Sequence, residues 1–117
     1  MKYDFLNKEA LYREGSELFL VRVIKQIEDD RGIQLRLKML ENKLAYMDAG
    51  LNIEYHKWSR SWDEFCISGD WSVQTYDGEI FTLIYVTAKL NFRRPVIDAF
   101  RREEKDWGEL WLAELLK

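Results

Sequence analysis

Regular alternation of apolar and polar side chains is the clearest pattern in the chain, and it predicts β-strands. Within residues 33–40, the apolar residues Ile33, Leu35, Leu37 and Met39 alternate with the polar residues Gln34, Arg36 and Lys38. Residues 17–28 are rich in β-branched and apolar side chains on both faces. Residues 29–32, Asp-Asp-Arg-Gly, lie between the two segments and are typical of a turn. The pattern therefore predicts a hairpin with one solvated face.

A second hairpin is predicted further along the chain. Residues 79–90 carry apolar side chains on both faces, which is typical of a strand covered on both sides at the centre of a sheet. Asp77 and Gly78 separate this segment from residues 71–76 and suit a type I′ turn, because both positions tolerate positive φ. Residues 51–57 alternate as well and predict another strand.

The segments between these strands allow more than one interpretation. Residues 42–50 fit a helix or a strand. Residues 65–67 fit a strand, or they continue a short helix that begins at the capping-box residue Ser61. Residues 68–70, Ser-Gly-Asp, are expected to form a turn.

Helices are expected at both ends of the chain. Residues 3–14 predict a short N-terminal helix with Asn7 as its cap. Pro95 begins a C-terminal helix, because the missing N–H of proline costs nothing in a first turn. Asp106 and Glu109 have the spacing of a capping box, which predicts a second helix or the second half of one kinked helix.

Together these elements predict an α+β fold, with residues 1–117 forming a single domain. We expect an antiparallel sheet of about five or six strands, on which a short N-terminal helix and a C-terminal helix or kinked helix pair are packed. Strands follow one another without intervening helices, which argues against a parallel, doubly wound sheet. Long strands twist and bend, so a curled half-barrel is compatible with the pattern.

Composition places the chain among folded globular domains. It has 117 residues, of which 47% are hydrophobic and 33% charged, and a single cysteine excludes an internal disulfide framework. The first residues lack the apolar run of a signal peptide, and no apolar stretch approaches the roughly 20 residues that span a bilayer. We therefore expect a soluble, cytoplasmic protein that does not enter a membrane.

The chain offers little material for catalysis or metal binding. His56 is the only histidine, and it lies on the polar face of a predicted strand. Cys66 stands between two apolar residues and is expected to be a small buried side chain rather than a reactive thiolate. No paired histidines or cysteines, nucleophile elbow or glycine-rich phosphate loop is present. We expect a protein that is not an enzyme and needs neither a metal nor another cofactor.

Charge is concentrated in the middle of the chain. The net charge is −3, and residues 41–81 hold 3 basic and 8 acidic side chains together with eight aromatic ones. Binding of nucleic acid requires the opposite sign, whereas a basic protein partner would be attracted. Tryptophan is also common at binding hot spots, although the alternative, a core position, is favoured for any one of these tryptophans. The candidate partner-binding residues are Trp58, Trp62, Asp63, Glu64, Asp70 and Trp71.

Three functions remain open at this stage. The first is a non-catalytic module that occludes a basic partner surface; in composition it resembles immunity proteins or antitoxins that inhibit nuclease-type toxins. The second is a small-molecule or lipid-binding domain with a cavity between a curved sheet and a helix. The third, weaker one is anion or nucleic-acid binding through Arg93 and Arg94 together with Arg101 and Arg102, residues that local acids are equally able to neutralise. Oligomeric state is undetermined.

Overall fold

The longest strand, β2 (Glu17–Glu28), is the centre of an open antiparallel sheet. The structure is a computed structural model that describes residues 3–41, 43–47, 52–57, 63–71, 77–104, 109–111 and 113. The other strands of the seven-stranded sheet are β1 (Glu9–Glu14), β3 (Gly32–Met39), β4 (Lys43–Met47), β5 (Ile53–Lys57), β6 (Glu64–Asp70) and β7 (Leu90–Asn91). The helices α1 (Gly78–Thr87) and α2 (Arg94–Arg101) pack on it, and residues 109–111 and 113 are also helical.

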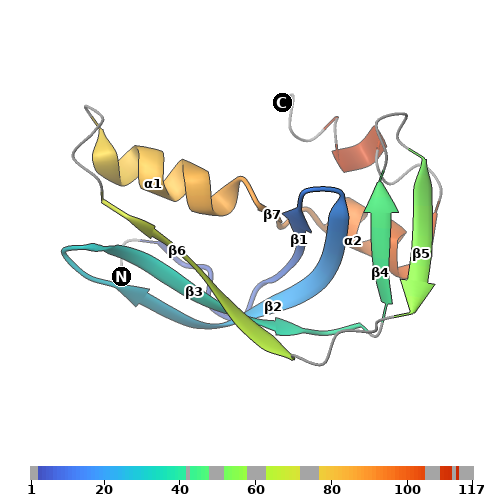
Figure 1. Ribbon diagram of the computed structural model, residues 1–117, viewed down its shortest axis with the longest axis horizontal. Helices are drawn as coiled ribbons and strands as arrows, with labels where there is room; N and C mark the ends of the chain where they lie inside the picture. The colour runs from blue at the N-terminus through green and yellow to red at the C-terminus, as the bar shows by residue number, and fades with distance from the viewer. Residues whose placement is uncertain are drawn as a thin grey trace.

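β2 is long enough to serve two parts of the sheet. One of its edges pairs with β1, which pairs in turn with β7. Its other edge pairs with β4 at Glu17 and Leu18, and with β3 from Val21 to Glu28. β5 extends the sheet beyond β4, and β6 extends it beyond β3. The sheet therefore branches from the two halves of β2, as the two groups of strands in Figure 1 show.

Successive side chains of β2 point to opposite faces of the sheet, and both faces are covered. Phe19 and Val21 belong to one hydrophobic cluster, the α1-side core, and Leu18 and Leu20 to another, the α2-side core. The buried members of the α1-side core are Ala10, Tyr12, Phe19, Val21, Val23, Ile33, Leu35, Leu37, Leu44, Ile67, Val86 and Leu90. Those of the α2-side core are Leu11, Leu18, Leu20, Ala45, Met47, Val96, Ile97, Ala99, Phe100 and Trp111.

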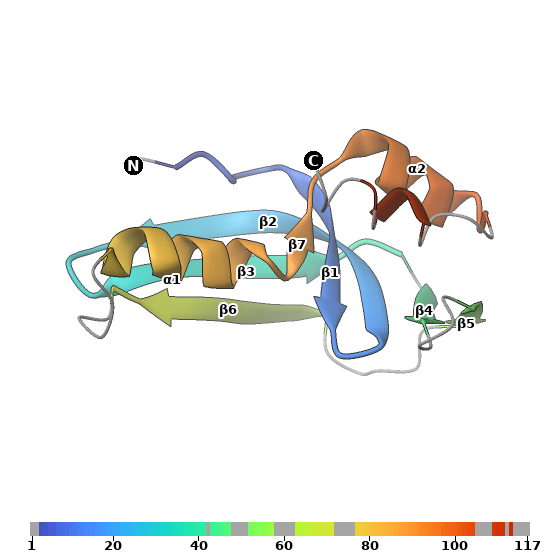
Figure 2. The same ribbon diagram turned by 90° about the horizontal axis from the view of Figure 1, so that it is seen from above.

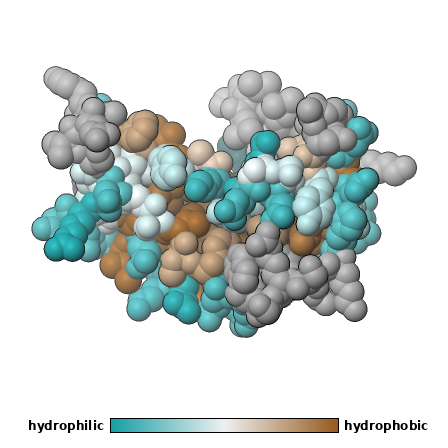
Figure 3. Space-filling model, viewed as in Figure 1, coloured by the Kyte–Doolittle hydropathy of each residue, from teal (hydrophilic) through white to brown (hydrophobic). Residues whose placement is uncertain are grey.

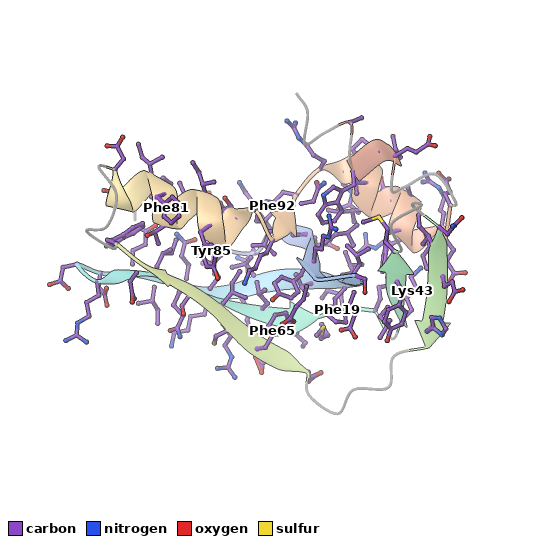
Figure 4. All side chains as sticks on the ribbon, turned by 45° about the horizontal axis from the view of Figure 1, so that its top comes forward. Phe19, Lys43, Phe65, Phe81, Tyr85 and Phe92 are labelled. Carbon is purple, nitrogen blue, oxygen red and sulfur yellow. The ribbon has the colours of Figure 1, made fainter. Side chains whose placement is uncertain are left out.

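The two helices cover these cores at opposite ends of the molecule (Figure 2). α1 packs on β6 and β3, and α2 packs on β1. α2 is also held to the β4–β5 hairpin by Lys43, whose Nζ donates hydrogen bonds to the carbonyl oxygens of Phe100 (2.7 Å) and Arg101 (3.0 Å). The same ammonium group lies 5.0 Å from the centre of the Phe100 ring, and Figure 4 labels Lys43 on this hairpin.

Several expectations from the sequence are confirmed. The fold is α+β with an antiparallel sheet, and the first predicted hairpin is β2 and β3. The strand expected over residues 51–57 is β5, described from Ile53 to Lys57, and within residues 42–50 the described part, Lys43–Met47, is strand β4. The helix expected at Pro95 is α2, and residues 109–111 and 113 are helical, whereas Asp106 lies outside the described residues. The sheet has seven strands rather than five or six.

The predicted N-terminal helix is wrong, because residues 9–14 form β1. Three consecutive residues, Ala10, Leu11 and Tyr12, are fully or almost fully buried, since β1 lies between β2 and β7 and is covered on both faces. A strand in that position buries neighbouring side chains on alternate faces. Leu6, Ala10 and Arg13 stand at helical spacing in the sequence, but Ala10 is buried whereas Leu6 and Arg13 are exposed.

The predicted strand over residues 79–90 is also wrong, because residues 78–87 form α1. A segment that is apolar on every side carries neither a strand period nor a helix period, so its pattern alone cannot decide between them. As a helix, it turns Thr82 and Val86 towards the sheet and leaves a row of apolar side chains exposed. Asp77 precedes the helix instead of forming a hairpin turn, and residues 72–76 of the proposed partner strand lie outside the described residues.

The turn predicted at residues 68–70 is instead the end of β6. Glycine suits this position in the strand because α1 lies so close to residue 69 that there is no room for a side chain. A Cβ atom at Gly69 would stand 2.8 Å from Cγ2 of Thr82 and 2.9 Å from Cγ2 of Val86. The hydroxyl group of Thr82 also donates a hydrogen bond to the carbonyl oxygen of Asp70, which ties α1 to the end of β6.

Candidate functional site: an acidic hollow beside Trp71

Four of the six partner-binding residues predicted from the sequence are described, and they stand at the two ends of β6. Asp63 and Glu64 stand at the start of β6, and Asp70 and Trp71 at its end. The strand is seven residues long, so at roughly 3.3 Å per residue the two pairs lie about 20 Å apart. Trp58 and Trp62 lie outside the described residues.

The start of β6 offers little free negative charge. The carboxylate of Glu64 accepts a hydrogen bond from Nε of Arg36 at 3.2 Å, and this bond raises the pKa of Arg36. Asp63 is exposed, and its carbonyl oxygen accepts a hydrogen bond from the backbone N–H of Met39 at 2.9 Å. One of the two acids expected to contact a partner is therefore paired within the chain.

Trp71 is an anchor at the other end of β6. Its indole Nε1–H donates a hydrogen bond to the carbonyl oxygen of Asp29 at 2.8 Å, and its backbone N–H donates one to Arg31 at 2.6 Å. The half-buried ring packs against the α1-side core. Both contacts fix the indole beside the β2–β3 turn while part of its surface stays accessible to a partner.

A hollow of about 350 Å³ opens beside this ring, and we call it the acidic hollow. Its walls come from the end of β2, the turn after it, the end of β6 and the first turn of α1, which meet at one end of the molecule in Figures 1 and 2. Its lining residues are Glu28, Asp29, Asp30, Trp71 and Glu79. The fold thus brings together four carboxylates and one indole ring from distant parts of the chain.

Asp29 and Glu79 each accept hydrogen bonds from neutral donors. Asp29 accepts hydrogen bonds from the backbone N–H groups of Arg31 and Gly32 at 2.8 and 3.0 Å, an arrangement that closes the turn. Glu79 accepts one from the Tyr3 hydroxyl at 3.2 Å. None of the described lining residues is a lysine or arginine, so the structure describes no cation within the hollow.

Asp30 is an exposed acid of the acidic hollow. Its side chain is exposed and makes no hydrogen bond or ion pair with any described residue. Asp70 is also exposed, and it lines a neighbouring hollow that includes Asp29 and Arg31. Of the residues predicted from the sequence, Trp71 therefore lines the acidic hollow and Asp70 stands beside it.

The arginines considered for anion binding lie close to acids of the same chain. Arg94 and Arg101 both bind the carboxylate of Glu9, and Arg101 also lies 3.5 Å from Glu41. Arg102 pairs with Glu104. The backbone N–H of Arg93 donates to the Asn91 side chain at 2.9 Å, ahead of α2. The ion pairs of Arg94, Arg101 and Arg102 reduce the positive charge that these three residues offer to an external anion.

The two remaining residues considered for catalysis, His56 and Cys66, lie on strands of the sheet. His56 is exposed on β5, with its Nε2 3.4 Å from Glu54. Cys66 was expected to be buried, but it is exposed, because the alternation of β6 turns it to the solvated face with Ser68.

No group of three or more metal-ligating side chains occurs among the described residues. In the same part of the chain, no helix is both long and apolar enough to cross a bilayer.

Sequence reasoning missed most of the acidic hollow. Glu28, Asp29 and Asp30 were assigned only to a strand end and a turn, and Glu79 to a strand. The local signal was the density of acids around that turn, but nothing in the sequence placed Trp71 or Glu79 beside it. Comparisons of the chain with protein-family models, curated proteins and solved structures find no match.

Proposed function

We propose that the protein is a non-catalytic binding module whose acidic hollow receives a basic side chain of a partner protein. The observation that carries this proposal is the convergence of four carboxylates on the half-buried indole of Trp71. A lysine or arginine entering the hollow would meet charges of opposite sign and the face of an aromatic ring. Both interactions favour a cation, and they strengthen as water leaves the site.

The hydrogen bonds around the hollow support this role. Asp29 accepts its hydrogen bonds from backbone N–H groups, and Glu79 accepts one from the Tyr3 hydroxyl, so these neutral donors orient the carboxylates. The indole is already fixed by its bond to Asp29, so little side-chain freedom is lost on binding. The field of the clustered acids would also accelerate encounter with a basic partner.

The specific form of this function that we propose is occlusion of a phosphate-binding surface, as an inhibitor of a nuclease-type toxin would require. Such a surface is basic because it binds phosphates, and carboxylates are able to occupy the same positions. Asp70 would extend the acidic hollow along the end of β6. In this form the protein acts as an immunity protein or antitoxin does, by covering the partner's site.

The two other functions considered from the sequence receive less support. A ligand cavity between sheet and helix would need space where α1 and β6 touch at Gly69. Anion binding would need arginines that are free, whereas Arg94 and Arg101 already bind Glu9. The acidic hollow has neither difficulty.

Binding of a fluorescently labelled hexa-arginine peptide, followed by anisotropy at low salt, tests the proposal. Asp30→Lys places a cation at the hollow without removing any described contact, so we expect affinity to fall at least about tenfold. Glu54→Lys is the matched control, because it makes the same charge change on β5 at an exposed residue far from the hollow.

We expect the control to change the affinity by less than about twofold at moderate salt, since distant surface charges are screened. Equal losses for both variants would mean that net charge alone attracts the peptide, and the proposed site would then be wrong. Absence of binding by the unmodified protein would also contradict the proposal.

A further inference from the structure

The outer side of α1 carries an exposed row of large apolar side chains, which we call the α1 stripe. Ile80, Phe81, Ile84 and Tyr85 are 53%, 54%, 59% and 52% exposed, whereas Thr82 and Val86 on the other side of the helix are buried. Figure 3 shows hydrophobic surface at this end of the molecule, and Figure 4 labels Phe81 and Tyr85 on α1. Contiguous apolar surface of this kind marks an interaction site.

The α1 stripe also has charge of opposite sign at its two ends. Asp77 precedes the helix and lies on the side of Phe81 and Ile84, since residues four and seven apart share a helix face. At the other end, Arg13 and Lys89 border a groove of about 460 Å³ whose walls include Phe81, Ile84 and Tyr85. The Lys89 ammonium lies 5.0 Å from the centre of the Tyr85 ring. The stripe is therefore acidic at its start and basic at its end.

Such a stripe is complementary to itself when two copies are related by a twofold axis. Asp77 and Lys89 are equally distant in sequence from residue 83, which is also close to the middle of the exposed row. An antiparallel pair of helices centred there would place Asp77 of each copy beside Lys89 and Arg13 of the other. The apolar side chains would meet between these charged ends.

We propose that a second copy of this chain covers the α1 stripe, forming an antiparallel, twofold-symmetric pair of α1 helices. Aromatic and large aliphatic side chains bury about 150–250 Å² each, so four half-exposed ones contribute about 400 Å² from each copy. With Ala88 and the stems of Arg13 and Lys89, the total approaches the roughly 1,000 Å² of the smallest specific interfaces. The area and the charge pattern fit a reversible homodimer.

The inferred dimer is independent of the proposed function, because its surface differs from the acidic hollow. Glu79 lines the hollow, whereas Asp77 lies about 160° away around the helix at 100° per residue. Peptide binding at the acidic hollow and self-association at the α1 stripe are therefore measured in separate experiments. A negative result in one experiment contradicts only the proposal that it tests.

Sedimentation velocity over about a hundredfold range of protein concentration tests the proposal. We expect a concentration-dependent dimer for the unmodified chain and at least about a hundredfold weaker association for Ile84→Glu, which places charges at the centre of the contact. Ile27→Glu is the matched control, because Ile27 is also exposed (40%) and pairs with solvent-facing Gln34 on the opposite face of the sheet. We expect the control to dimerise normally.

Exchanging the charges of Asp77 and Lys89 tests whether the molecule that covers the α1 stripe is a second copy of this chain. Asp77→Lys and Lys89→Asp should each weaken the dimer about tenfold, and the double variant should restore most of the affinity, because each residue faces the other across the twofold axis. Circular dichroism checks that every variant is folded. A monomer at all concentrations, a double variant weaker than both single ones, or binding of monomers to phosphatidylglycerol vesicles in place of dimer formation would overturn the proposal.

Discussion

Tyr12 is a buried phenol whose ionisation opposes folding. Its ring lies between Phe19, with centroids 6.1 Å apart, and Phe65, 4.9 Å away, and the residue is 3% exposed. Burial raises the pKa of Tyr12 to about 12, and the negative charge of Glu14 adds to the increase. In the unfolded chain the same phenol has its ordinary pKa of about 10.

This difference predicts a loss of stability in alkali. Below pH 10 both states hold the proton, whereas between pH 10 and 12 only the folded state does, so the free energy of unfolding falls by up to about 1.4 kcal/mol per pH unit. Urea unfolding at a series of pH values measures this loss. Tyr12→Phe keeps the ring contacts and should have a flatter profile; identical slopes for both proteins would show that another group is responsible.

At the scale of elements, the contact between α1 and β6 depends on the absence of a side chain at Gly69. The neighbouring methyl groups of Thr82 and Val86 belong to buried, β-branched residues that have little room to rotate. The same contact explains why a Ser-Gly-Asp sequence, typical of a turn, continues a strand here. Turn propensity is local, whereas the helix that packs on this glycine is remote in sequence.

Gly69→Ala should therefore lower the free energy of unfolding by about 1–3 kcal/mol, because the added methyl group forces α1 away from the sheet. Ser68→Ala is the matched control on the solvated face of the same strand, and it should change stability by less than about 0.5 kcal/mol. Urea unfolding compares them. A Gly69→Ala protein as stable as the control would contradict close packing of α1 on β6.

At the scale of the whole molecule, two cores share one strand. The α1-side core and the α2-side core lie on opposite faces of β2, and the backbone of that strand bonds to β1, β3 and β4. Loss of either core exposes one face of β2 and weakens support for the other. We therefore expect the molecule to unfold as one cooperative unit, which is the behaviour of a single domain.

Ile97→Val tests this cooperativity, because it removes one methyl group from the α2-side core and should cost about 1 kcal/mol. The buried side chains of β3 belong to the other core, the α1-side core. If the molecule unfolds as one unit, the free energy of opening that controls amide hydrogen exchange in β3 should fall by the same amount, and exchange there should become faster. Exchange measured by mass spectrometry provides the comparison. Unchanged exchange in β3, with acceleration confined to α2 and its neighbours, would indicate two units that unfold separately.

The candidate site was predictable only in its general character. Concentrated acids and tryptophans indicated an acidic, aromatic surface, and Trp71 does line such a hollow. Which acids accompany it was not predictable, because β6 separates Asp63 from Asp70 and the fold adds Asp30 from a turn and Glu79 from a helix. Contacts between residues about forty positions apart have no local signature in a single sequence.

The sequence by itself determined the elements whose local signals agree: the β2–β3 hairpin, with its alternation and its Asp-Asp-Arg-Gly turn, and α2, which begins beside Pro95. Only the tertiary structure decided the conformation of β1 and α1. α1 is apolar around most of its circumference, and β1 has three consecutive apolar residues between charged ones, so burial rather than period selects between strand and helix. Tertiary packing also created the acidic hollow and the α1 stripe, because each depends on which side of α1 meets the sheet.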